Sequence, residues 1–162
     1  MQLPVFAFRL IGRFSTTHLD RWLHPLLYRA TGGRGIVGRF LGAEMLLLTT
    51  TGRHSGLRRT VALFAFAVAQ PAGSRAVIGS RGGSREIPAW YRNLQARPEA
   101  SIQVHRDVVT VRSREAVGDE YETIFESAAA VYPGFRLYRA EARRPIPIVV
   151  LEPVTPMAPR MS

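Results

Sequence analysis

The chain has 162 residues, 46% of them hydrophobic, which suits one globular domain with a core of its own. The formal net charge is +10 and all 22 basic residues are arginines, which favours anionic partners such as phosphorylated cofactors, acidic lipids or nucleic acid. The absence of cysteine excludes disulfides, thiolate nucleophiles and Cys-ligated zinc. The four scattered histidines match no metal-ligand spacing, so we expect no metal site.

The first thirty residues carry two stretches with apolar residues at helical spacing, over 2–14 and 16–30. Such a stripe either packs on the domain core, as most amphipathic helices do, or lies on a membrane surface, so residues 1–30 are a candidate peripheral membrane contact. No apolar run approaches the roughly 20 residues that span a bilayer, and no secretory signal is evident. We therefore expect a cytoplasmic protein, with the inner face of the cell membrane as a candidate location.

Residues 33–38, GRGIVG, match the pattern GxGxxG letter for letter. The dinucleotide fingerprint needs a strand before it and a helix after it, whereas here a helical stretch precedes and a strand-like run follows. We therefore interpret this segment as a flexible connector. The expected organisation is N-terminal helices and connector over 1–39, a cofactor-binding barrel over 40–153, and a disordered tail over 154–162.

Residues 45–60, MLLLTTTGRHSGLRRT, predict a buried strand that ends in threonines and then turns. Residues 61–68 predict its partner strand, so the polar segment around 52–59 is expected to be the tip of a hairpin. Glycine permits positive φ, so successive N–H groups can converge on an anion, and hydroxyls and guanidinium groups add charge-assisted hydrogen bonds. The alternative is an ordinary polar hairpin tip without a ligand.

A second loop of the same character follows the third predicted strand, residues 75–80. It has the sequence SRGGS over 80–84 and leads into a helix with Pro88 in its first turn. A helix N-terminus beside a glycine-rich cationic loop favours anion binding through the helix dipole and through free N–H groups. Trp90 in this helix offers either a flat face for a bound ring or a plain core anchor.

The rest of the chain completes a sheet. Alternating apolar and polar residues predict strands over 101–106 and 108–114, joined by a tight turn at 105–107. A helix over 120–131, a short helical piece carrying Tyr138 and a closing strand over 147–152 follow. About six mostly antiparallel, hairpin-connected strands with flanking helices and no βαβ alternation predict an α+β fold with a small β-barrel.

Five sequence blocks recur in one known family in the order in which they stand here: LLLTTTGRHSGLRR, SRGG, PAWYRNL, VYPGF and IPIVVLEP. Over residues 40–153 the chain resembles the deazaflavin-dependent nitroreductases of the flavin and deazaflavin oxidoreductase superfamily. The resemblance implies a split β-barrel. It also implies hydride transfer from a reduced 8-hydroxy-5-deazaflavin (coenzyme F-420) to a quinone or nitroaromatic acceptor.

The same resemblance implies roles for individual residues. Those expected to bind the coenzyme are Arg53, His54, Ser55, Gly56, Arg58, Arg59, Thr60, Ser80, Arg81, Gly82, Ala89, Trp90, Tyr91 and Asn93. Phe135 and Tyr138 are expected to line the substrate pocket, with Tyr138 as the candidate catalytic residue. The chain departs from the family pattern at His54, Leu57 and Arg58, and at Phe135, where a substrate-facing tyrosine is common; Tyr138 is then the hydroxyl available to the acceptor.

Two alternatives stay open. The first is an oxidoreductase that binds FMN on the same fold. The second is a non-catalytic protein that binds a deazaflavin or an anionic membrane, an interpretation that rests on the +10 charge. Nucleic acid is not expected as a partner, because aromatic and basic residues are not interleaved as in RNA-binding surfaces. We expect a monomer or a homodimer with a small-molecule acceptor.

Overall fold

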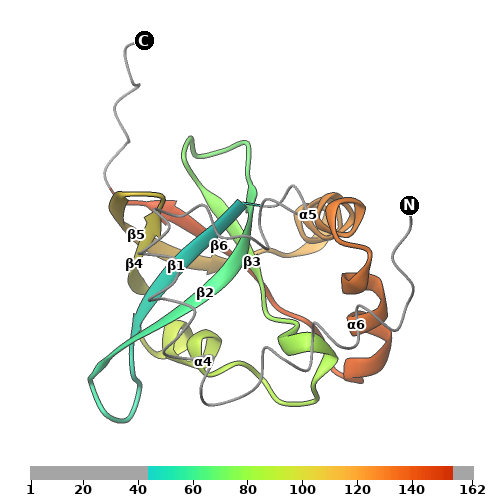
Figure 1. Ribbon diagram of the computed structural model, residues 1–162, viewed down its shortest axis with the longest axis horizontal. Helices are drawn as coiled ribbons and strands as arrows, with labels where there is room; N and C mark the ends of the chain where they lie inside the picture. The colour runs from blue at the N-terminus through green and yellow to red at the C-terminus, as the bar shows by residue number, and fades with distance from the viewer. Residues whose placement is uncertain (1–43, 155–162) are drawn as a thin grey trace.

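Six antiparallel strands close into a barrel in the part of the chain that the computed structural model describes, residues 44–154 (Figure 1). The strand order around the barrel is β1-β2-β3-β6-β5-β4. The strands are β1 (Glu44–Thr51), β2 (Arg58–Ala67), β3 (Arg75–Ile78), β4 (Glu99–Val104), β5 (Asp107–Glu115) and β6 (Ile148–Pro153). The helices are the short 3-10 helix η1 (Arg81–Gly83), α4 (Ala89–Ala96), α5 (Gly118–Val131) and α6 (Gly134–Ala142). The predicted α+β barrel is confirmed.

The barrel interior is filled by alternate residues of the strands, as the two-residue period of a strand requires. In β1, Leu46 and Leu48 are fully buried and join one cluster with Val77 of β3 and Leu151 of β6. Helix α4 adds apolar side chains to this same cluster, among them Leu94. The helix therefore packs against the interior of the barrel rather than on its side.

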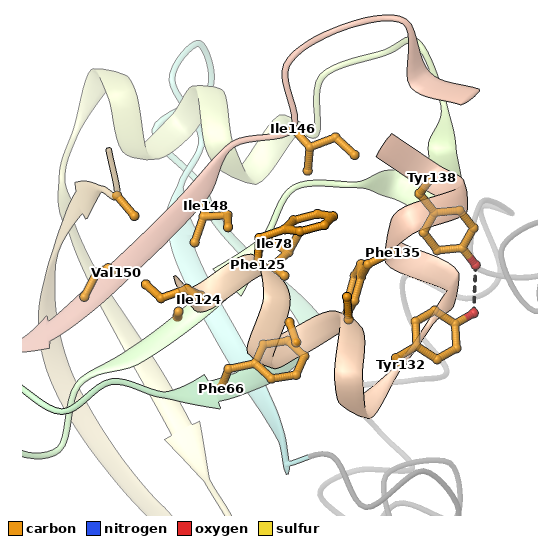
Figure 2. Packing of buried hydrophobic residues seen from close by; sticks show 14 of the residues in the cluster. Phe66, Ile78, Ile124, Phe125, Tyr132, Phe135, Tyr138, Ile146, Ile148 and Val150 are labelled. Atoms are coloured by element: carbon orange, nitrogen blue, oxygen red, sulfur yellow. Dashed lines mark hydrogen bonds between the residues drawn. The ribbon is translucent and has the colours of Figure 1, made fainter. Parts of the chain in front are cut away.

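A second apolar cluster lies on the outer face of the barrel, beneath α5 and α6 (Figure 2). Phe66 of β2 and Val150 of β6 point outward into it, and Phe125 of α5 is fully buried at its centre. The guanidinium carbon of Arg139 lies 3.8 Å from the centroid of the Phe125 ring, a cation–π contact that closes the cluster on its outer side. The two helices therefore cover only part of the barrel wall.

The predicted hairpin tip is shorter in the structure, because β2 begins at Arg58 rather than near residue 61. Thr51 pairs with Arg58, and the hydroxyls of Thr49 and Thr60 lie 2.9 Å apart across the two strands. Pairing with β1 thus extends β2 through three polar residues. Arg58 and Thr60 face outward, whereas Arg59, the partner of Thr50, lies on the other face of the strand and is exposed near its end. The expected tip at 52–59 is corrected to 52–57.

The turn between β4 and β5 lies where it was predicted, and His105 within it has φ of 55°. The predicted helices at 2–14 and 16–30, the connector at 33–38 and residues 155–162 of the tail lie outside the described residues. Between residues 44 and 154, none of the helices is both long and apolar enough to cross a membrane.

Candidate functional site

The turn from β1 to β2 is a closed backbone loop. The N–H of Gly52 donates to the carbonyl of Leu57 at 2.8 Å, and the N–H of Gly56 donates to the carbonyl of Gly52 at 2.8 Å. Gly56 has φ of 68°, which only glycine adopts without strain. A Cβ at Gly52 would lie 3.2 Å from the carbonyl oxygen of Leu57 and would displace the exposed Ser55 hydroxyl, which is 2.6 Å away. The turn therefore requires glycine at position 56 for its φ and leaves little room for a side chain at position 52.

The cations of this turn are available to a ligand. Arg53, His54 and Arg59 form no ion pair with any other residue between 44 and 154, and Arg59 and His54 are exposed. Arg58 points to the outer face of the barrel and donates to the hydroxyl of Ser101 at 3.3 Å. Unpaired guanidinium groups around one backbone turn make a cationic surface suited to phosphate or carboxylate groups.

Asn93 of α4 holds this turn in place. Its side-chain oxygen accepts from the backbone N–H of Arg53 at 3.1 Å, and its side-chain nitrogen donates to the hydroxyl of Thr50 at 3.1 Å. Asn93 is 5% exposed and Thr50 is 2% exposed. The structure thus places the side chain of Asn93, a residue expected to bind the coenzyme, beneath the turn and in contact with its backbone.

The second predicted loop follows β3 and contains η1. Ser80 has right-handed backbone angles, whereas Arg81, Gly82 and Gly83 all have positive φ, of 46°, 61° and 80°. A change from right-handed to positive φ at successive residues turns neighbouring N–H groups toward one point, an anion-binding concavity. The side chain of Arg81 is in an ion pair with Glu86, an exposed carboxylate of the same loop.

Ser80 is the least exposed polar residue of this loop, at 6%. Its hydroxyl bonds to no other residue of the described chain. The oxygen still reaches solvent, because among the described residues the buried hydroxyl that lacks a partner is that of Ser74 and not that of Ser80. A ligand at this loop can therefore bond to the Ser80 hydroxyl in place of water.

The two loops lie at the same end of the barrel. Strands β1 and β3 both run antiparallel to β2, so their carboxyl ends point toward the same end of the barrel. The last residue pairs that they make with β2 are Thr51 with Arg58 and Val77 with Ala65, so these two pairs are seven residues apart along β2, about 23 Å. In Figure 1 the β1–β2 turn, α4 and η1 follow one another along the lower edge of the molecule.

The outer face of β2 connects the loops. Thr60 and Ala62 are partly exposed there, and Phe64 lies further along with its ring centroid 6.0 Å from that of Tyr132. The strand therefore passes from cationic through small to aromatic side chains between the first loop and the second. An elongated ligand with an anionic end and a flat end fits this order.

The residues of α4 that were expected to bind the coenzyme differ in their exposure and packing. Ala89 is exposed beside the second loop, whereas Trp90 is 8% exposed and belongs to the interior cluster, with its ring packed against the edge of Tyr91. The Tyr91 hydroxyl donates to Glu115. Burial, followed by the bond to this carboxylate, raises the pKa of Tyr91 to about 12. Of the two interpretations of Trp90, the position in the core favours the anchor.

The residues expected to line the substrate pocket are packed together in the outer cluster (Figure 2). Phe135 and Tyr138 are each 4% exposed, and Phe135 lies on the strand side of both Tyr138 and Tyr132. The hydroxyls of Tyr132 and Tyr138 lie 2.8 Å apart. Burial raises the pKa of Tyr138 above its ordinary value, and its hydroxyl is protonated at neutral pH as that of an ordinary tyrosine is.

The second loop is packed directly on this aromatic pair. A Cβ built at Gly83 would lie 3.4 Å from both Cα and Cδ1 of Tyr138. Sequence reasoning did not assign a role to Tyr132, although VYPGF was one of the recognised blocks; the pairing of its hydroxyl with Tyr138 becomes visible only in the fold. In the described part of the chain, no group of histidine, aspartate and glutamate side chains is placed to hold a metal ion.

Sequence reasoning also missed Arg144, which follows α6 and bonds to the second loop. A shallow hollow of about 270 Å³ lies beside the first loop on the outer face of β1 and β4, lined by Thr49, Thr51, Arg58 and Ser101 among others. It adds hydroxyls to the cations of the turn, and no sequence motif marked Ser101.

Known proteins are similar to this chain in sequence and in fold. The family model of the F420H(2)-dependent quinone reductases matches residues 22–153. An F420H(2)-dependent quinone reductase of Mycobacterium tuberculosis is 35% identical over 136 residues, which cover 80% of this chain and 87% of that protein. A solved structure described as an F420-H2 dependent reductase has a TM-score of 0.60 at 34% identity and covers 67% of this chain and 93% of the other.

A further solved structure, described as a domain-swapped dimer, also has a TM-score of 0.60 at 34% identity, and covers 67% of this chain and 79% of the other. The family resemblance predicted from the sequence blocks is confirmed by these matches. With a match over most of its length and a six-stranded barrel in common, the chain belongs to the F420H(2)-dependent quinone reductase family.

Proposed function

We propose that this protein is an oxidoreductase that uses a reduced 8-hydroxy-5-deazaflavin coenzyme to reduce a quinone or a nitro compound. The bound coenzyme supplies the hydride. The protein itself needs to bind and orient the coenzyme and the acceptor, and to exclude water from them. The observation that carries the proposal is the pair of loops at one end of the barrel, one with unpaired cations and one with the Ser80 hydroxyl beside three residues of positive φ.

The donor set fits a coenzyme with an anionic tail and a polar ring. Arg53, Arg59 and the backbone of the first loop would hold the phosphate and acidic tail, because each charge-assisted hydrogen bond contributes about 1.5–3 kcal/mol. Ser80 and Arg81 would hold the ring or its sugar-alcohol chain about 23 Å further along β2. Both assignments follow the chemistry of the side chains and the order of the loops.

The acceptor would lie against the aromatic residues of the outer cluster. Reduction of a quinone by a hydride also takes up a proton, and the Tyr138 hydroxyl holds one at neutral pH, paired with Tyr132. Phe135 supplies an apolar surface but no proton. We therefore assign the candidate catalytic role to Tyr138 and a packing role in the substrate pocket to Phe135.

Two further parts of the proposal concern the membrane and the oligomeric state. Contact of residues 1–30 with the inner face of the cell membrane, where lipid-soluble quinones reside, is supported by the sequence alone. A homodimer as the associated form is supported by the related structure described as a domain-swapped dimer.

Coenzyme binding is tested by titrating the protein with the oxidised deazaflavin while following tryptophan fluorescence. Arg59→Ala should raise the dissociation constant roughly tenfold to a hundredfold, the equivalent of one charge-assisted hydrogen bond. The matched control is Arg106→Ala, which removes the same charge from the exposed β4–β5 turn at the opposite end of the barrel. Its dissociation constant should stay within about twofold of wild type.

Three results would contradict the proposal. One is wild-type protein that gives no quench at tens of micromolar coenzyme. Another is equal weakening by Arg59→Ala and Arg106→Ala, which would mean that total charge and not the loop attracts the ligand. The third is displacement of the deazaflavin by an equal concentration of FMN, which would favour the flavin alternative on the same fold.

A further inference from the structure

Arg144 lies just after α6 and reaches back across about sixty residues of sequence to the loop at 79–86. Its Nε donates to the carbonyl of Ser84 at 3.0 Å. Its Nη2 lies within hydrogen-bonding distance of three further carbonyls, those of Gly79 at 3.1 Å, Ser80 at 3.3 Å and Glu86 at 3.0 Å. One guanidinium group therefore contacts both the start and the end of the loop.

The surroundings of Arg144 differ from those of other arginines in the barrel. Arg75, Arg114 and Arg136 each pair with at least one carboxylate. Between residues 44 and 154, no carboxylate lies within ion-pair distance of Arg144, whose contacts are backbone carbonyls. Burial, followed by repulsion from Arg81, lowers the pKa of Arg144 below its ordinary value.

The loop that Arg144 contacts is strained. Three successive residues have positive φ, and one of them, Arg81, is not a glycine. Such a backbone persists only where neighbouring groups hold it in place. The backbone of the loop makes two internal hydrogen bonds, from Gly83 to Ser80 at 3.0 Å and from Ser84 to Arg81 at 3.1 Å. Both lie within residues 80–84, so neither of them connects the first residue of the loop, Gly79, to the last, Glu86.

We propose that Arg144 is a positioning residue that fixes the 79–86 loop so that Ser80 and Arg81 face the coenzyme; this role rests on the proposed function. The planar guanidinium group suits the task, since it presents five N–H donors in a fixed fork to several carbonyls at once. A lysine at 144 keeps the charge but donates from a single nitrogen and cannot replace this set of contacts.

Three variants separate geometry from charge. Arg144→Gln removes the guanidinium group, and Arg144→Lys keeps its charge without its shape. Arg143→Gln is the matched control, because Arg143 is exposed, adjacent, and bonded to no other side chain of the described residues. Two quantities are measured for each: amide hydrogen exchange in peptides that cover 79–86, without coenzyme, and the dissociation constant for the oxidised deazaflavin by tryptophan fluorescence.

In Arg144→Gln the 79–86 amides should exchange about tenfold faster or more, while exchange in the barrel strands stays unchanged, because local opening then costs fewer hydrogen bonds. The dissociation constant should rise about tenfold or more. Arg144→Lys should resemble Arg144→Gln in both measurements, and Arg143→Gln should resemble wild type.

The proposal is overturned if the 79–86 amides exchange at the wild-type rate in Arg144→Gln. It is also overturned if Arg144→Lys restores wild-type behaviour, or if Arg143→Gln has the same effect as Arg144→Gln, since charge alone would then explain the result. Wild-type protein that does not bind the coenzyme would refute the proposed function instead. Faster exchange confined to 79–86 would still support anchoring by Arg144 in that case, and unchanged exchange would overturn it.

Discussion

Two hydrogen bonds of Asn93 connect α4 to the β1–β2 turn, and their contribution to stability can be predicted. Asn93→Ala removes the bonds to the Arg53 N–H and to the Thr50 hydroxyl, both at 3.1 Å. Each bond contributes about 1 kcal/mol net, and the buried Thr50 hydroxyl loses its donor partner, so the free energy of unfolding should fall by about 2–3 kcal/mol. For a chain of this size the melting temperature should fall by about 5–10 °C.

A double-mutant cycle isolates the side-chain bond. Thr50→Val keeps the volume but leaves the Asn93 amide without its acceptor, which should cost about 1–2 kcal/mol. The double variant Asn93→Ala/Thr50→Val should be less destabilised than the sum of the single variants by about 1 kcal/mol, because their shared bond is lost only once. Urea unfolding followed by circular dichroism measures all three free energies.

The control is Arg92→Ala, an exposed neighbour on the same helix, which should change the free energy of unfolding by less than about 0.5 kcal/mol. The reasoning is refuted if Asn93→Ala is as mild as this control. It is also refuted if the effects of Asn93→Ala and Thr50→Val simply add, since the 3.1 Å contact would then carry no energy of its own.

Two other predictions concern alkaline pH and the glycines of the loops. The pKa of Tyr91 is about 12 in the fold and 10.0 ordinarily, so its contribution to stability is present below pH 10 and is lost as the pH rises toward 12. Tyr91→Phe should therefore flatten the fall in melting temperature over this window, and an unchanged slope would contradict the assignment. Gly56→Ala and Gly83→Ala should each lower the stability by about 1 kcal/mol, because both glycines have positive φ, of 68° and 80°. A Cβ would meet nothing within 4 Å at Gly56 and only ordinary contacts at 3.4 Å at Gly83, so both variants should melt at similar temperatures below that of wild type; a wild-type melting temperature in either would refute this.

Local patterns predicted the barrel well, because strands that face a core on one side show their period in the sequence. The apolar run at 45–48 and the alternation at 101–104 both became strands. The start of β2 at Arg58 was missed, since polar residues next to a glycine turn resemble the turn itself. Only the pairing of Arg58 with Thr51 makes it part of a strand.

The site was predictable in part. The glycines and cations of both loops stand together in the sequence, so their chemistry is evident before folding. Arg144 gave no such signal, because one arginine among 22 carries no mark of its own and its partner Gly79 lies 65 positions away. The alternative roles of Trp90 also could not be separated from the sequence, since an indole serves equally in a core and against a ring.

The anchor beneath the first turn has a consequence for how this protein family can diversify. Because Asn93 and Thr50 hold the backbone of the turn from inside, its shape does not depend on which cations it displays. Replacing His54 by lysine, or Arg58 by a small residue, should then change the charge of this surface while the free energy of unfolding stays nearly constant. Under the proposed function, coenzyme affinity can thus change one surface charge at a time, without a compensating change in the core.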